Sequence, residues 1–320
     1  MNKVANDISS FRTEIMGVAT SMILLGHSVF YGQGFVDYGL LQNLFTLGYS
    51  GVDIFLFLSG FGLVFSMKKN DKITFYKHRI ARIVPSVLAI MFLNVLVNIS
   101  HFGGFIFNPL YWFGLYWYIG FILLAYLGFP YLYQSIKRHG YLVFIASLLF
   151  SVLLFLPFLI TGHGESSSMT CLITRIPIFV LGACLVMGGQ VYLYSKKIIF
   201  PATIIGLLAL WLFYYYDNLG GNRTINTYYV FTLLTPGIVW LISCCLKITF
   251  KLKLLMEFWR ILGKYSLEIY LVQVTIMYPF MCFLEKHGCL MLVNVFLSFS
   301  IVFLMSVSLK FVTDKVKKML

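Results

Sequence analysis

The sequence predicts an all-α fold, a polytopic membrane helical bundle of about ten transmembrane helices with both termini in the cytoplasm. Composition supports this prediction, because 60% of the 320 residues are hydrophobic, only 11% are charged, and the mean hydropathy is +0.89. The apolar residues stand in long unbroken runs, which favours helices over the short alternating segments of a transmembrane barrel. Basic residues gather in every second loop between these runs, as is typical of cytoplasmic loops.

This composition excludes several classes of protein. A soluble globular chain is about 25% charged and roughly 45–50% apolar, so a soluble enzyme, a disordered chain and a disulfide scaffold are excluded. The formal net charge of +13 belongs to the loops rather than to one domain face, so we expect no nucleic-acid partner. The six cysteines lack metal-ligand spacing with histidine, so we expect no metal site. They are interpreted as small packing residues, with a Cys282–Cys289 disulfide as the less favoured alternative.

The first five spans are apolar runs close to the ~20 residues that a helix needs to cross a bilayer. They are expected at 13–31, 45–66, 80–100, 111–133 and 141–161. A cluster of lysines and arginines separates the second span from the third, and Lys137 with Arg138 separates the fourth from the fifth. Pro85 and Pro130 lie inside or near these spans, where we expect kinks.

The last five spans follow the same pattern. They are expected at 170–190, 198–216, 228–247, 262–284 and 290–311. Pro201 lies near the start of its span, where proline is tolerated. Pro177, Pro236 and Pro279 lie deeper and are expected to kink their helices.

The distribution of positive charge predicts the orientation of the bundle. With the N-terminus inside, the inside loops hold nearly all of the 24 lysines and arginines. The outside loops hold only Arg223 and Lys286, and Arg175 lies within a span. A wrong number of spans would scramble this alternation, so it supports a multi-pass protein of the cell membrane.

The chain reads as one membrane domain over residues 1–320. No linker, charge run or internal repeat divides it, and the missing repeat weakens a two-half transporter architecture. The first span lacks a small-residue cleavage site after it, so we expect it to be retained rather than removed as a signal peptide. We expect no attached soluble catalytic domain.

Ionisable and polar groups at membrane depth are the first candidates for a site, because burying them there is costly. They are His27, Asp53, Arg175, Glu268 and Gln273. Each has a structural alternative. His27 would bond to a neighbouring backbone carbonyl, Asp53 would pair with Arg175, and Glu268 would pair with Lys264 one turn earlier on the same helix.

The cytoplasmic mouth of the bundle is cationic. Arg12 with Glu14 lies on one side of it, and Arg79 and Arg82 lie on the other. The two arginines are three residues apart at a helix start, so they share a face and are placed to bind phosphate groups. The alternative is that they are ordinary positive-inside residues. A buried histidine further in would take a proton from a hydroxyl group.

Four aromatic residues at the start of the fourth expected span are typical of an interfacial belt. They are Tyr111, Trp112, Trp117 and Tyr118. We expect them to mark the outer surface of the membrane rather than a substrate site.

Six stretches, in order along the chain, resemble the acyltransferase 3 family of integral membrane enzymes. They are GVATSMILLGHS (17–28), GVDIFLFLSGFG (51–62), RIARIVP (79–85), the aromatic stretch 117–130, RIPIFVLG (175–182) and GKYSLEIYLVQ (263–273). The second is the most specific, and together they cover about 12–310 in the order that the family has them.

The resemblance implies a membrane-bound O-acyltransferase, with acyl-CoA from the cytosol, most commonly acetyl-CoA, as donor. The acceptor would be a hydroxyl group of a cell-envelope or exported polysaccharide or sugar, in a bacterial plasma membrane. No resident cofactor is implied. His27 would be the catalytic base and Asp53 a catalytic pocket residue. The residues that would bind substrate are Arg12, Arg79, Arg82, Arg175, Glu268 and Gln273.

Two positions depart from the family pattern. The family usually carries an arginine where this chain has Met16, and Arg12 is interpreted as its substitute from one turn earlier. A histidine of the ninth span is here Gln273, which forms hydrogen bonds but carries no charge. These two departures favour an inactive scaffold or sensor as one alternative to the enzyme. Ten spans with buried charges also permit a transporter or flippase for envelope glycans.

Overall fold

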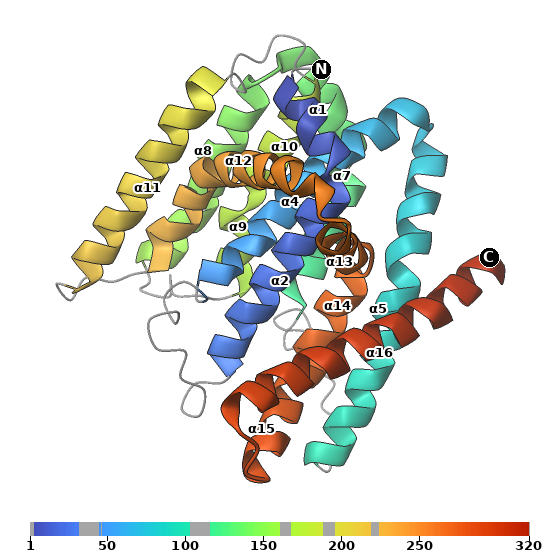
Figure 1. The fold of residues 1–320 in the computed structure, drawn as a ribbon. Helices are drawn as coiled ribbons and strands as arrows, with labels where there is room; N and C mark the ends of the chain where they lie inside the picture. The colour runs from blue at the N-terminus through green and yellow to red at the C-terminus, as the bar shows by residue number, and fades with distance from the viewer. Residues whose placement is uncertain are drawn as a thin grey trace.

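The computed structural model describes residues 3–31, 45, 47–102, 116–160, 168–187, 196–218 and 224–319. These form helices, with no strand among them (Figure 1). The longer helices are α2 (Arg12–Tyr31), α4 (Ser50–Lys69), α5 (Lys72–Phe102), α7 (Trp117–His139), α8 (Leu142–Ile160), α10 (Ile176–Met187), α11 (Lys196–Asn218), α12 (Thr224–Ile248) and α16 (Met291–Met319). The shorter elements are α1 (Lys3–Ser10), η2 (Leu47–Tyr49), α9 (Ser168–Thr174), η4 (Thr249–Lys251), α13 (Lys253–Lys264), α14 (Ser266–Val272), the π-helical η5 (Gln273–Met277) and α15 (Tyr278–Lys286).

The helical membrane fold is confirmed. Eight helical stretches of the described residues are long and apolar enough to cross a membrane. The shorter apolar helices Leu142–Phe158 and Ile199–Leu212 occupy the other two expected spans. The total of ten spans and the cytoplasmic placement of both termini stay predictions.

Helix α4 forms the centre of the bundle, with most of its residues buried between α2 and α10. Glycines set how closely its backbone approaches that of α10. A side chain on Gly60 would collide with the Phe179 carbonyl, and one on Gly182 would collide with the Phe57 carbonyl. Small residues allow such close crossings in membrane bundles, where packing replaces the hydrophobic effect as the driving force.

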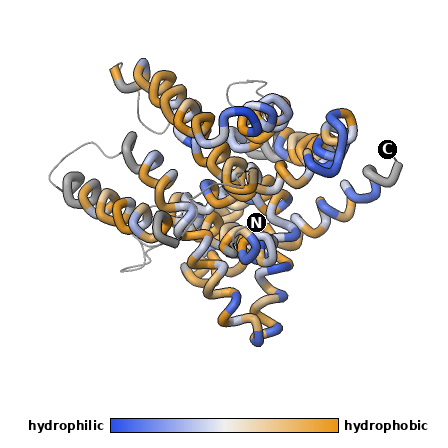
Figure 2. Tube along the Cα trace, turned by 90° about the horizontal axis from the view of Figure 1, so that it is seen from above, coloured by the Kyte–Doolittle hydropathy of each residue, from blue (hydrophilic) through white to orange (hydrophobic). Residues whose placement is uncertain are grey.

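The outer helices present apolar side chains away from the core. On α8, α11 and α16, Leu153, Trp211 and Phe296 are each more than 60% exposed. Figure 2 shows apolar residues along most of the length of the helices, including those at the edge of the molecule. This pattern suits contact with lipid rather than water.

The cysteines pack as free thiols. All six are unpaired, so the alternative Cys282–Cys289 disulfide is not formed.

Candidate functional site

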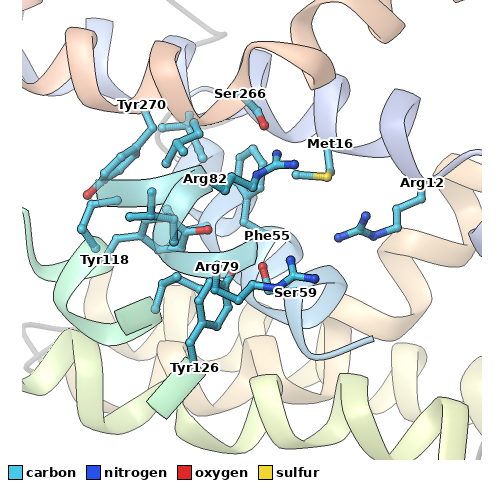
Figure 3. Close-up of a pocket in the computed structure, with 16 residues that line it drawn as sticks. Arg12, Met16, Phe55, Ser59, Arg79, Arg82, Tyr118, Tyr126, Ser266 and Tyr270 are labelled. Atoms are coloured by element: carbon cyan, nitrogen blue, oxygen red, sulfur yellow. The ribbon is translucent and has the colours of Figure 1, made fainter. Parts of the chain in front are cut away.

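A pocket lies among α2, α4, α5, α7 and α14 (Figure 3). It encloses about 760 Å³ of space, part of which is open to solvent. Its polar lining residues are Arg12, Ser59, Arg79, Arg82, Tyr118, Tyr126, Ser266 and Tyr270. The apolar ones are Met16, Ile23, Val52, Phe55, Ile83, Ile119, Ile122 and Leu267.

Three guanidinium groups meet in this pocket. Figure 3 shows those of Arg79 and Arg82, from α5, directed toward that of Arg12, from α2. Arg12 donates to the Leu58 carbonyl oxygen of α4, with N···O distances of 3.2 and 3.4 Å. Arg79 donates to the Ser66 hydroxyl at 2.7 Å. Arg12, Arg79 and Arg82 therefore line one pocket, and its opening to the cytoplasm stays a prediction.

Among the residues that the structure describes, the three arginines have no acidic partner. The ion pairs between residues that the structure describes all use other cations. Glu14, two residues after Arg12 in the sequence, forms its ion pair with Arg260. Three like charges close together repel one another, and a partly buried guanidinium without a carboxylate is costly. The pocket is therefore suited to a ligand with several negative charges.

Gly62 leaves room for the Arg12 side chain. A Cβ atom built on Gly62 would lie 2.6 Å from an Arg12 guanidinium nitrogen, so any larger residue would displace it. Met16, one helical turn after Arg12, lines the same pocket. Arg12 therefore does reach the space beside position 16, as the sequence suggested.

Two tyrosines form the wall of the pocket away from the arginines. Tyr118 of α7 and Tyr270 of α14 pack edge to face, with ring centroids 4.9 Å apart. Both are almost fully buried. The assignment of Tyr118 to an interfacial belt is therefore wrong, because burial in the bundle overrides its place in the aromatic cluster. Tyr111 and Trp112 lie outside the described residues.

His27 lies beyond the pocket on the same face of α2. Arg12, Met16, Ile23 and His27 are separated by 4, 7 and 4 residues, which keeps them on one helix face. The helix carries His27 about 22 Å from Arg12. The pocket lining includes Ile23 but not His27, which comes one turn later.

The His27 imidazole is half-buried and faces aromatic rings. Its centroid lies 5.3 Å from that of Tyr31, which in turn lies 5.6 Å from Tyr278. Its Nδ1 atom is buried and has no hydrogen-bond partner among the described residues. The alternative of a backbone carbonyl bond is therefore not seen at this nitrogen.

Asp53 and Arg175 form the buried ion pair that was their structural alternative. Arg175 Nε donates to Asp53 Oδ1 at 2.9 Å, and the side chains are only 2% and 1% exposed. The guanidinium lies over the rings of Tyr228 and Trp117, at 4.2 and 5.1 Å. Asp53 Oδ2 is buried without a partner among the described residues. Neither residue lines the arginine pocket.

Glu268 is buried in α14 and faces α16. Its carboxylate lies 3.7 Å from Lys310 Nζ. The alternative pair with Lys264 is not formed, because the helix breaks at Tyr265 and the four-residue spacing no longer places both side chains on one face. Lys264 lies over the Tyr265 ring instead.

Gln273 opens a π-helical turn, a feature often found at functional sites. It is 1% exposed, and its Oε1 has no partner among the described residues. In the same turn, Thr275 shares a 2.6 Å hydrogen bond with the Tyr116 hydroxyl, to which Asn94 donates at 3.2 Å.

Sequence reasoning missed several polar groups of these sites. They are Ser59, Tyr126, Tyr270, Asn94, Tyr116 and Thr275. Ser59 and Tyr270 lie inside the stretches GVDIFLFLSGFG and GKYSLEIYLVQ, so the motifs contained a signal for them. Asn94 and Tyr116 stand in unremarked sequence, and only the packing of α5 and α7 brings them together.

A family model described as an acyltransferase domain matches residues 17–314. No curated protein and no solved structure matched the chain. The match includes His27, Arg79, Arg82 and the two tyrosines of the pocket wall. Arg12 and Met16 precede its first residue.

Proposed function

Because this chain belongs to the acyltransferase family whose model covers residues 17–314, we propose that it moves an acyl group from cytosolic acyl-CoA to a hydroxyl group of a sugar or polysaccharide of the cell envelope. Acetyl-CoA is the proposed donor. It acts as a substrate, and the reaction as proposed uses no resident cofactor or metal.

The observation that carries the proposal is the set of three arginines in one pocket, with no acidic partner in the described part of the chain. Coenzyme A carries a diphosphate and a ribose phosphate at one end and the thioester at the other. Arg12, Arg79 and Arg82 offer fork-shaped donors that match phosphate oxygens. A donor bound there would place its polyanionic end at the open mouth and its uncharged arm inside the bundle.

The face of α2 that carries Arg12 indicates where the uncharged arm of the donor would lie. It leads from Arg12 past Met16 and Ile23 to His27, about 22 Å away along the helix. Tyr118 and Tyr270 line the pocket whereas His27 does not, so the arm is proposed to pass beside this pair of rings on its way to His27. Because the two rings pack edge to face, we propose that they form a constriction between the arginine pocket, where the donor binds, and His27, where the reaction takes place.

His27 is the proposed general base. In the reaction, His27 takes the proton of the acceptor hydroxyl, and the hydroxyl oxygen attacks the thioester carbonyl carbon. The C–O bond of the new ester forms, the C–S bond breaks, and the proton passes to the departing coenzyme A thiolate. Base catalysis of this kind contributes about 10²–10⁴ in rate.

Three buried groups are proposed to serve the acceptor end. Asp53, held by Arg175, keeps Oδ2 available as a hydrogen-bond acceptor, and Gln273 keeps Oε1 available. Both atoms suit sugar hydroxyl groups, which donate such bonds. Glu268 is proposed to act indirectly, by fixing α14 against Lys310 of α16.

A paired experiment tests the proposal. Acetyl-CoA binding to the purified protein is measured for wild type, Arg79→Gln/Arg82→Gln and the control Lys68→Gln/Lys69→Gln, which removes the same charge outside the pocket. Losing charged hydrogen bonds worth about 1.5–3 kcal/mol weakens binding by more than about tenfold. The control should bind like wild type, and equal binding by all three would contradict the donor site.

A second experiment, in cells, tests the role of His27. Envelope glycans from cells producing the wild-type protein should gain an acyl mass by mass spectrometry, and those from cells producing His27→Ala should not. His27→Ala should still bind acetyl-CoA. Wild-type acylation by this variant would remove His27 from the chemistry.

A further inference from the structure

Helix α13 has three distinct faces around its axis. Its packed face is buried against the bundle and consists of Met256, Leu262 and Gly263. Its charged face is exposed and consists of Lys253, Glu257, Arg260 and Lys264. Between them lies an apolar face that is also exposed, with Leu254 at 90%, Phe258 at 50% and Ile261 at 37%. At 100° per residue, each set falls in its own sector.

The packed face fixes α13 to the first turns of α2. A side chain on Gly17 would collide with the Trp259 carbonyl, and one on Gly263 would collide with the Thr13 carbonyl. Arg260 adds a 3.0 Å ion pair to the buried Glu14. In Figure 1, α13 is seen nearly end-on whereas α2 is seen along its length, so the two helices cross steeply. The helix therefore lies across the end of the bundle that holds the arginine pocket.

The chain before α13 extends the exposed apolar surface. Ile248, Phe250 and Leu252 are 81%, 61% and 56% exposed. The Phe250 ring packs edge to face against the Phe11 ring, with centroids 6.2 Å apart, and Phe250 still remains mostly exposed.

Exposed lysines flank this apolar surface. Lys251, Lys253 and Lys264 form no ion pair with any residue that the structure describes, whereas Lys247 and Arg260 are paired with Asp7, Glu14 and Glu257. Three cations beside an uncovered apolar strip are complementary to a surface that is both negative and apolar.

A helix with this pattern fits neither water nor the centre of a bilayer. Water would leave six large apolar side chains exposed, and the bilayer centre would strip water from the lysines. The boundary between headgroups and acyl chains satisfies both sets, as it does for interfacial amphipathic helices.

We propose that residues 248–264 form an interfacial anchor that binds anionic phospholipids. Leu254, Phe258 and Ile261 lie among the acyl chains, and Lys251, Lys253 and Lys264 contact the phosphate headgroups. The proposal stands independently of the acyl-transfer reaction. It also ties the position of the α2 start, and with it Arg12, to the membrane surface.

Photo-crosslinking in vesicles tests both parts of the proposal. The full chain carries p-benzoyl-phenylalanine at position 258, or one residue earlier at position 257, which points about 100° away. The vesicles contain equal amounts of phosphatidylglycerol and phosphatidylcholine. We expect lipid adducts from position 258, few from position 257, and at least about a five-fold preference for phosphatidylglycerol at 258.

A charge variant and its matched control complete the experiment. In Lys251→Gln/Lys253→Gln/Lys264→Gln the preference for phosphatidylglycerol at position 258 should fall toward one. In Lys68→Gln/Lys69→Gln/Lys72→Gln, which loses three exposed lysines elsewhere, it should stay. Protein adducts in place of lipid adducts at 258, equal labelling of both lipids by the wild type, or an unchanged preference in the first variant would each overturn the proposal.

Discussion

The position of Arg12 is the residue-scale feature on which the proposed donor site most depends. Arg12 reaches the pocket from one turn before Met16, lies over Gly62, and is anchored by the Leu58 carbonyl. Since positions 12 and 16 lie on one helix face, a guanidinium from either enters the same space.

This geometry predicts a rescue. Arg12→Met should weaken acetyl-CoA binding about tenfold or more, because one charged donor to phosphate is lost. Arg12→Met/Met16→Arg should recover most of the affinity. Isothermal titration of the purified variants checks this, and a double variant as weak as the single one would show that Arg12 acts only through its bond to Leu58.

At the residue scale, the sequence pattern predicted which polar residues are buried better than it predicted their interaction partners. His27, Asp53, Arg175, Glu268 and Gln273 were all found as buried or half-buried polar groups, because ionisable residues stand out in apolar runs. Asp53 and Arg175 were correctly paired. The partner of Glu268 was missed because a helix break at Tyr265 and the approach of Lys310 from α16 cannot be read from local spacing.

Helix crossings are the features that matter at the scale of elements. The reciprocal contacts of Gly60 with Phe179 and of Gly182 with Phe57 bring α4 and α10 together. These two glycines lie in stretches 51–62 and 175–182, two of the six stretches that resemble the acyltransferase 3 family. The sequence located such glycines but not their partners, since which helices cross is decided by tertiary packing. The same holds for α13, where Gly17 and Gly263 meet.

Gly182→Val should therefore destabilise the bundle. Its added side chain would meet backbone atoms that cannot move aside, and overpacking of this kind costs about 1–3 kcal/mol. Gly128→Val is the matched control, because nothing lies within 4 Å of a Cβ atom at Gly128. Thermal unfolding in detergent should show a lower Tm for Gly182→Val only; equal values for both variants would contradict the crossing.

At the scale of the whole molecule, composition alone predicted the class, and the apolar runs predicted the positions of the helices. Helices occupy all ten expected spans over the residues described. The orientation depends on charge asymmetry between loops rather than on packing.

Reporter fusions test that orientation. Alkaline phosphatase fused after Leu320 should be inactive and a fluorescent protein there should be bright, because both termini are predicted to lie in the cytoplasm. The phosphatase inserted after Arg223 should be active. Phosphatase activity at the C-terminus would contradict its cytoplasmic placement and therefore the predicted number of ten spans.

In the proposed reaction, one donor molecule contacts the arginines and His27 together. Bromoacetyl-CoA places an alkylating carbon where the acyl group sits, so peptide mapping by mass spectrometry can locate the adduct it forms. We predict an adduct on His27 that forms at least about tenfold more slowly in Arg79→Gln/Arg82→Gln and at the wild-type rate in Lys68→Gln/Lys69→Gln. Labelling that bypasses His27, or that reaches it equally fast without the two arginines, would contradict the account.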